Sequence, residues 1–202
     1  MIDIKQVVAL QTDMVARWHL GPVLNSQDGT LGIVCEQHRW NFLLWHEEDM
    51  ARSPVASDRE IADVKRAIDR YNQQRNDWIE RLDDHIAEQL EQARVALELD
   101  ARLNTETPGS AIDRLSIMAL RIYHLEEQLQ RSDASPEHRA SVLGKLNRCR
   151  QQQQDLVAAT QRLIHDIFAG KTRHRTYRQY KMYNDPNLNP QIYNATAQRR
   201  AA

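Results

Sequence analysis

Apolar residues recur every three or four positions along most of this chain, which is the spacing of one face of an α-helix. No strand-like alternation of useful length interrupts the pattern. The sequence therefore predicts an all-α fold, a bundle of about five helices. We expect these helices at residues 3–18, 31–52, 58–98, 111–129 and from Ser135-Pro136 to about Gly170.

Several expected helix boundaries carry specific start and stop residues. Thr107-Pro108 and Ser135-Pro136 each place a hydroxyl at the N-cap and proline at the first helical position. Gly21-Pro22 and Gly170 are natural stops. The pattern over 58–98 contains neither Gly nor Pro. It predicts one helix of about 60 Å at 1.5 Å per residue, long enough to project from a compact core or to pair with a second subunit in a homodimer.

Charge divides the chain into an acidic body and a basic end. Residues 171–202 carry seven Lys or Arg, one acid and four of the six tyrosines, which leaves 20 basic and 27 acidic side chains in residues 1–170. Pro186 and Pro190 make helix improbable there. We expect an irregular, basic, Tyr-rich segment docked on the acidic body, so that residues 1–202 form a single helical domain. Nucleic acid is not the expected partner, because the acidic body would repel it.

Composition and motifs exclude several classes of protein. No run approaches the roughly 20 apolar residues of a membrane span, and no N-terminal basic region precedes an apolar stretch. We therefore expect no membrane insertion and a cytoplasmic location. Cys35 and Cys149 lack metal-binding spacing and are expected to be free thiols. The chain has no Gly-rich phosphate loop, and Met50 stands where a zincin motif beginning at His46 needs its second histidine.

Candidate chemistry rests on polar residues at positions where the helical pattern expects apolar ones. His46 and Asp49 are three residues apart and so neighbours on one helix, where they could share a proton or a metal ion. Asp113 and His124 share a face about 16 Å apart, so each must contact another helix. Arg75 lies in the apolar stripe of residues 58–98 and needs a partner, for which Asp113 and Asp69 are the candidates. A structural ion pair and a hydrogen-bonded core histidine remain the simpler alternatives.

A metal centre has only weak support in the pattern. Helical bundles hold metals with acids or histidines three residues apart, and Glu80 with Asp83 offers such a pair. We place both on the polar side of their helix, where acids at this spacing are common by chance. The cofactor stays open, with magnesium the expectation if oxygen ligands dominate.

Four motifs give the chain a family resemblance. They are Trp45-His46-x-Glu48-Asp49; Lys65-Arg66-x-Ile68-Asp69-x-x-Asn72-Gln73-x-Arg75-x-Asp77; Asn104-Thr105-Glu106-Thr107-Pro108 continuing through Ile112-Asp113-Arg114-Leu115-Ser116-Ile117 to Ile122-Tyr123-His124; and Tyr177-x-Gln179-x-Lys181-Met182-Tyr183-Asn184-Asp185 with Leu188-Asn189-Pro190. Over about residues 40–190 the chain resembles the bacterial domain-of-unknown-function family 4254, which has no established activity. The shared pattern contains His46, Asp49, Asp69, Asn72, Arg75, Asp77, Asp113, Arg114, His124, Lys181 and Asp185. The genes of that family tend to lie near glycosyltransferases of cell-surface polysaccharide assembly, which implies a sugar or nucleotide-sugar setting.

Two functional hypotheses follow. In the first, a buried polar pocket binds or processes a phosphorylated small molecule, such as a nucleotide or nucleotide sugar, in cell-surface glycan metabolism. His46, Asp49 and His124 are then the catalytic candidates, and the ligand-binding candidates are Asp69, Asn72, Arg75, Asp77, Asp113, Arg114 and Lys181. In the second, the protein is a non-enzymatic helical adaptor for a protein partner such as a glycosyltransferase. Whether the protein is an enzyme is left open.

Overall fold

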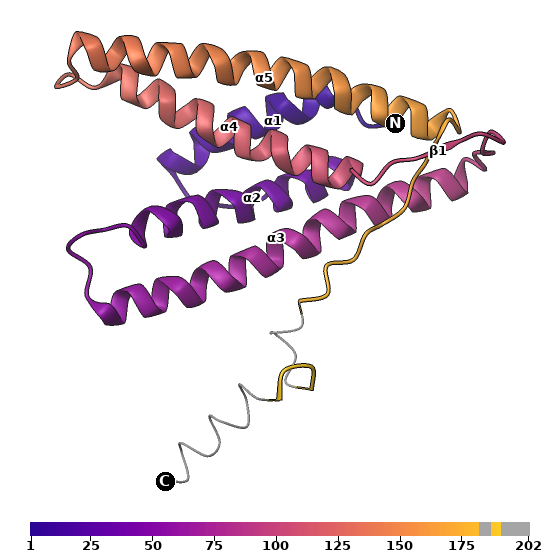
Figure 1. Cartoon of the computed structure of the whole chain (residues 1–202), viewed down its shortest axis with the longest axis horizontal. Coiled ribbons are helices and arrows are strands. Elements are labelled where there is room, and N and C mark those ends of the chain that lie inside the picture. Colours follow the sequence, from indigo (N-terminus) through magenta and orange to yellow (C-terminus); the bar gives the residue numbers. More distant parts are fainter. Residues whose placement is uncertain (182–186, 191–202) are drawn as a thin grey trace.

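The computed structural model describes residues 1–181 and 187–190. In this part the chain forms five helices and one pair of two-residue strands (Figure 1). The predicted all-α bundle is confirmed. The elements are α1 (Ile4–Leu20), α2 (Gly29–Met50), α3 (Asp58–Gln92), β1 (Arg102–Leu103), α4 (Pro108–Gln130), α5 (Pro136–Phe168) and β2 (Thr172–Arg173).

The predicted start signals act as caps. Thr107 and Ser135 accept hydrogen bonds from the backbone N–H groups of Ser110 and His138, and a proline follows each cap as the first helical residue. At the start of α3, Ser57 and Glu60 form a reciprocal capping box. These side chains satisfy backbone donors that would otherwise lack partners at the helix ends.

The third helix is shorter than predicted, because α3 ends at Gln92 and not near residue 98. Arg94 adopts the left-handed region at φ 51°. The chain after it approaches Gly170, which itself has φ +76° and whose added Cβ would lie 2.1 Å from the Ala96 carbonyl oxygen. β1 then pairs in parallel with β2, with Arg102 opposite Thr172. Apolar spacing alone did not predict that this long-range contact replaces the last helical turns.

The core joins all five helices, with α4 at the centre. One cluster combines Ile4 and Val7 of α1, Val34 of α2, Leu82 and Ile86 of α3, Ile112 and Leu115 of α4, and Ile164 of α5. A second cluster includes Trp18 of α1, Phe42 of α2 and Leu120 of α4. α4 contacts the other four helices. Cys35 and Cys149 are buried free thiols, as expected.

Residues 174–181 of the basic C-terminal segment lie against α3, which the segment crosses in Figure 1. His174 Nε2 donates to the Asp83 carbonyl oxygen at 2.7 Å, and Thr176 Oγ1 donates to Asp84 at 3.0 Å. Arg178 pairs with Asp84 at 2.8 Å and with Glu80 at 3.1 Å. The predicted docking on acidic residues is therefore confirmed up to residue 181, and residues 182–186 and 191–202 lie outside the description. Among the described helices, none is sufficiently long and apolar to cross a bilayer.

Candidate functional site

Arg75 of α3 forms an ion pair with Asp113 of α4. Arg75 Nε donates to one carboxylate oxygen at 2.8 Å, and Nη2 donates to the other. The Asp113 side chain is only 5% exposed and that of Arg75 24%. The hydrogen bond to Asp113 raises the pKa of Arg75 above its ordinary value, against the lowering effect of burial. Of the two partners that the sequence suggested for Arg75, the structure selects Asp113.

Two amides of α2 hold the Asp113 carboxylate in place. Gln37 Nε2 and Asn41 Nδ2 both donate to the oxygen that also accepts from Arg75 Nε. Charged hydrogen bonds of this kind have strong geometric preferences. The guanidinium of Arg75 is consequently fixed in orientation by three helices.

The polar network continues through the core to α1. Asn41 also donates to Ser116 Oγ at 2.8 Å, and Ser116 lies 2.6 Å from His38 Nδ1. His38 Nε2 donates to the Gln11 carbonyl oxygen at 3.0 Å, so Nδ1 is the ring acceptor and Ser116 donates to it. Burial lowers the pKa of His38 to about 3. The fully buried ring is therefore neutral.

A cavity of about 370 Å³ opens beside Arg75 between α2, α3 and α4. Among the described residues, Arg75 Nη1 has no hydrogen-bond partner. A second guanidinium, that of Arg52, lies on the same cavity and pairs with Glu48 at 3.0 Å. The lining consists of Asn41, Leu44, Trp45, Glu48, Asp49, Arg52, Arg75, Ile117 and Leu120. This cavity combines an aromatic ring with an oriented arginine that retains donors.

Other candidates of α3 lie near Arg75 in sequence but bind neighbours on their own helix. Asp69 pairs with Lys65 on the exposed face of the helix, and Asp77 accepts from Gln73 at 2.7 Å. Lys181 of the C-terminal segment comes close, because Asp77, Arg75 and Asp69 all influence its pKa, which burial lowers. Asn72 is half-buried one turn before Arg75. The structure thus brings Lys181 to the end of the α3 motif.

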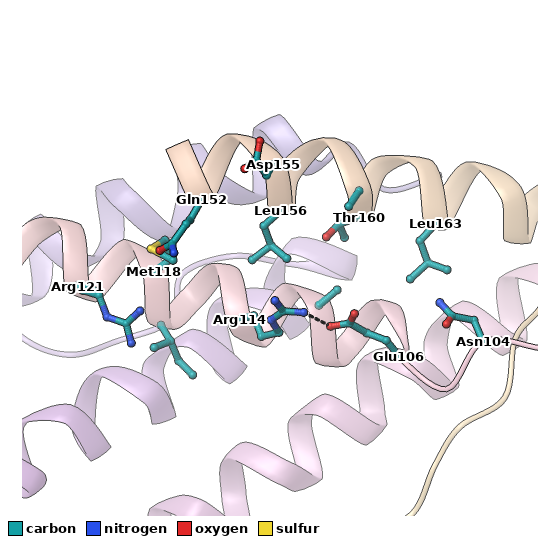
Figure 2. Close-up of a pocket in the computed structure, with 13 residues that line it drawn as sticks. Asn104, Glu106, Arg114, Met118, Arg121, Gln152, Asp155, Leu156, Thr160 and Leu163 are labelled. Atoms are coloured by element: carbon teal, nitrogen blue, oxygen red, sulfur yellow. Dashed lines mark hydrogen bonds and ion pairs between the residues drawn. The ribbon is translucent and has the colours of Figure 1, made fainter. Parts of the chain in front are cut away.

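Arg114 lies apart from this group. It lines a second cavity, of about 710 Å³, between α4 and α5 together with Arg121 and Gln152 (Figure 2). There its guanidinium pairs with Glu106 at 2.5 Å, and both side chains are largely exposed. The sequence proposed one pocket for Arg75 and Arg114, and the structure places them in two.

The weak metal candidates Glu80 and Asp83 have structural partners. Asp83 is buried, not solvated as predicted, and accepts from the Gly109 backbone N–H at 2.7 Å. Burial raises the pKa of its carboxyl, while hydrogen bonds to it and the nearby His174 lower it. Glu80 accepts from Arg178 and from the backbone N–H of Gln179 at 2.8 Å. These acids join α3 to α4 and to the C-terminal segment.

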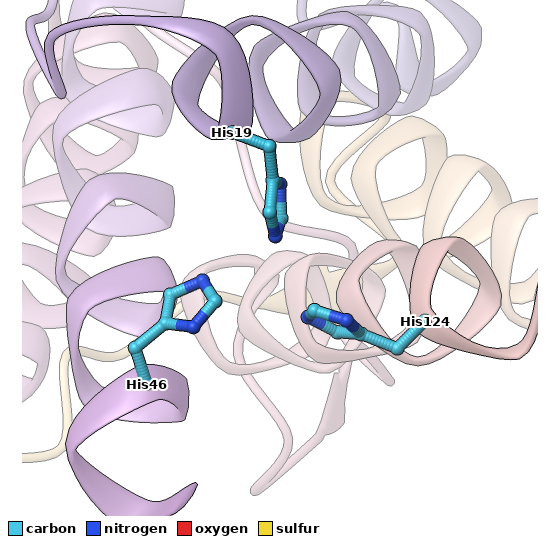
Figure 3. Close-up of side chains that lie close together, drawn as sticks. All are labelled: His19, His46 and His124. Carbon is cyan, nitrogen blue, oxygen red and sulfur yellow. The ribbon is translucent and has the colours of Figure 1, made fainter. Parts of the chain in front are cut away.

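His46 and His124 meet a third histidine that the sequence analysis missed. His19 of α1 lies with its ring centroid 5.1 Å from that of His46 and 5.2 Å from that of His124 (Figure 3). No hydrogen bond joins His46 to Asp49 in the described part of the chain. The predicted helix ends at residue 18, whereas α1 continues to Leu20 and therefore includes His19.

The sequence model of one protein family matches most of the chain. Its description is "Protein of unknown function (DUF4254)", and the match covers residues 31–176. The chain belongs to this family. Nothing in the comparison with curated proteins matches the chain, nor does any solved structure.

The DUF4254 match includes most of the polar residues described above. The Arg75–Asp113 pair, the lining of the cavity beside it, His46 and His124 all fall within residues 31–176. His19 lies before the matched region and Lys181 lies after it. The matched region therefore does not reach α1 or the fourth motif of the resemblance, which begins at Tyr177.

Proposed function

We propose that this protein binds a phosphorylated small molecule in the cavity between α2, α3 and α4. The supporting observation is Arg75, whose Nε and Nη2 are held by Asp113 while Nη1 has no partner among the described residues. A guanidinium is planar and matches the oxygens of a phosphate group. Because Asp113 already fixes this one, little side-chain freedom is lost when a ligand binds.

The rest of the lining suits a nucleotide or nucleotide sugar. Trp45 offers a flat apolar surface to a base or sugar ring. Arg52 is exposed at the end of α2 and can exchange Glu48 for a phosphate oxygen. Lys181 adds positive charge near Arg75. A volume of about 370 Å³ lies toward the small end of ligand sites, which favours a mononucleotide or sugar phosphate over a larger ligand.

The proposal concerns binding, because neither catalytic candidate histidine is among the residues lining this cavity. His124 stacks on the ring of Trp45 at a centroid distance of 5.1 Å, and His46 contacts His124. The proposed role in cell-surface glycan metabolism is supported by the family resemblance alone. We use this role to choose the nucleotide-sugar and sugar-phosphate probes below.

A thermal-shift experiment tests the proposal with pyrophosphate, ADP, UDP, UDP-glucose and glucose 1-phosphate, each with and without magnesium. A ligand at 100 times its Kd adds about 2.7 kcal/mol of stability, which corresponds to a rise in Tm of roughly 5–10 °C for a domain of this size. Arg75→Lys keeps a cation opposite Asp113 but loses the planar fork. We expect it to reduce the shift produced by the best probe.

Arg114→Ala is the matched control, because it removes an ion-paired arginine from the other cavity. It should leave the shift unchanged. If no probe raises Tm, or if Arg75→Lys and Arg114→Ala retain the same shift as the parent, the proposal is wrong.

The adaptor hypothesis is the alternative that such a result would favour. The adaptor hypothesis was supported by a predicted helix long enough to extend beyond the core. In the structure α3 ends at Gln92, and it has buried or core-packed residues from Ala67 to Leu90. We therefore place it second. A pull-down with and without residues 171–202 would be the corresponding test.

A further inference from the structure

Three histidines from three helices converge on one point beside the core. His19 extends from α1, His46 from α2 and His124 from α4, and their rings are directed toward one another (Figure 3). One ring nitrogen of each lies within 4.8 Å of the corresponding nitrogens of the other two. The sequence separations exclude a local helical motif, so the arrangement is produced by the packing of the bundle.

The hydrogen bonds of two rings use the outward Nδ1 atoms and leave the inward Nε2 atoms without a partner. His19 Nδ1 lies 2.7 Å from the Val15 carbonyl oxygen, which can only accept, so this nitrogen carries the proton. His124 Nδ1 likewise donates to the Glu127 carboxylate at 2.7 Å. In both rings Nε2 is buried and has no hydrogen-bond partner. Buried polar atoms without partners are rare in folded proteins and call for an explanation.

The third ring, that of His46, packs against apolar and aromatic neighbours. Burial lowers the pKa of His46 below its ordinary value, and the neighbouring His19 and His124 lower it further, while Asp49 and Glu127 oppose this. Phe42 packs on the His46 ring at a centroid distance of 4.5 Å. Imidazole is the commonest protein ligand of transition-metal ions.

From this convergence of three imidazoles on one point we propose that His19, His46 and His124 bind one divalent transition-metal ion of the zinc class. Imidazole nitrogens bind Zn²⁺ at about 2.0–2.1 Å, and tetrahedral ligands at that distance lie about 3.3 Å apart. Side-chain rotations that bring the nitrogens together by about 1.5 Å complete the site. Magnesium, which prefers oxygen ligands, does not suit it.

The partners of the outward nitrogens are those that metal-binding histidines use. A backbone carbonyl for His19 and a carboxylate for His124 fix the tautomer and orient each ring. Trp45 and Tyr123 stack on His124 and His19, at centroid distances of 5.1 Å and 4.3 Å, and limit the motion of those rings. Three protein ligands leave a fourth position for water or a ligand atom, which is the pattern of catalytic zinc sites. The site is distinct from the proposed anion cavity, although Trp45 contacts both.

The test uses the untagged full-length chain, stripped of metal by a chelator and titrated with Zn²⁺ by calorimetry and with Co²⁺ by visible spectroscopy. We expect one ion per chain and the intense ligand-field absorption of four-coordinate Co²⁺. His46→Ala and His124→Ala should each lower the affinity at least 100-fold. His138→Ala is the matched control, since this exposed histidine begins α5 away from the cluster, and it should leave the titration unchanged.

Glu127→Gln gives a second readout that does not depend on removing a ligand. The Glu127 side chain is 45% exposed, so the variant should fold, and losing such an outer partner lowers metal affinity about 10- to 100-fold. The proposal is overturned if the parent binds less than one ion per chain, or if folded histidine variants bind Zn²⁺ as tightly as His138→Ala does. It is also overturned if Co²⁺ stays six-coordinate in the parent. None of these outcomes involves a phosphate probe, so they are independent of the proposed function.

Discussion

Removing one member of the Arg75–Asp113 pair should destabilise the fold far more than removing the second member afterwards. Asp113→Leu leaves the guanidinium of Arg75 and the amides of Gln37 and Asn41 without their shared acceptor. Breaking a buried ion pair from one side costs about 3–5 kcal/mol. Because the Arg75 side chain is 24% exposed and borders a cavity, water can reach it, and we expect about 3–4 kcal/mol.

Arg75→Met leaves a carboxylate that still accepts from two amides. Asp113 keeps Gln37 and Asn41 but is only 5% exposed, so we expect a loss of about 3 kcal/mol. In the double variant no buried charge remains. The double variant should therefore be no less stable than Asp113→Leu alone, which gives a coupling energy of about 3 kcal/mol, at the upper end of the range for residues in contact.

Urea unfolding of the four proteins, followed by far-ultraviolet circular dichroism and by tryptophan fluorescence, measures this cycle. Equal m-values across the four proteins are required before the free energies of unfolding are compared. Additive single losses in the double variant, or a loss below about 1 kcal/mol for Asp113→Leu, would refute the assignment of this pair as a desolvated, mutually dependent unit.

Three further predictions concern the core, the helix contact and the docked segment. Since the folded pKa of His38 is about 3 and the unfolded value is about 6.5, its contribution to stability is complete above pH 6.5 and is lost as pH falls toward 3. Urea unfolding at successive pH values should show this loss at up to about 1.4 kcal/mol per pH unit, and His38→Gln should remove that part of the slope. Gly109→Ala places a Cβ 2.6 Å from the Ile79 carbonyl oxygen and 2.9 Å from the Asp83 carboxylate, so it should lower the free energy of unfolding by about 1–3 kcal/mol. Gly144→Ala is the control, because its Cβ has no atom within 4 Å and should stabilise α5 by up to about 1 kcal/mol. If both variants change thermal stability in the same way, α3 and α4 do not pack closely at Gly109. The double variant Glu80→Gln, Asp84→Asn removes the charge partners of Arg178. Trypsin should therefore cleave it at Arg175 and Arg178 faster than it cleaves the parent or the surface control Glu137→Gln. An unchanged cleavage rate would argue against docking of the C-terminal segment on α3.

Local sequence signals predicted the helices well because their causes are local. A Ser or Thr followed by Pro determines where a helix starts through bonds within one turn, and the caps at Thr107 and Ser135 formed as expected. The end of α3 has a different cause. Its final residues meet Gly170 and the β1–β2 pair, and contacts about 70 residues apart in sequence leave no trace in an apolar periodicity.

The candidate site residues also differ in whether their contacts could be predicted from the sequence. A buried guanidinium requires a carboxylate partner, and this rule gave Asp113 and Asp69 as candidates, of which the structure selects Asp113. The same rule does not predict which neighbouring helix a given side chain faces. Arg114 follows Asp113 directly in sequence, yet a step of one residue rotates the side chain by about 100°, which places it in the cavity between α4 and α5. Asp83 was misjudged for a related reason, because its partner is the backbone N–H of Gly109, a donor that no pattern of side chains reveals.

The histidine cluster was not predicted, because the sequence analysis paired His46 with a residue of its own helix. His46 and Asp49 are near neighbours in sequence, and this proximity suggested a shared proton, but the inward partners of His46 are rings from α1 and α4. What brings them together is the second core cluster, in which Trp18 of α1, Phe42 of α2 and Leu120 of α4 pack beside the three rings. Each histidine follows or precedes one of these apolar residues by one turn or less. A bundle that buries the apolar residues must therefore also bring the imidazoles into contact, so the packing that stabilises the core also assembles the proposed metal ligands.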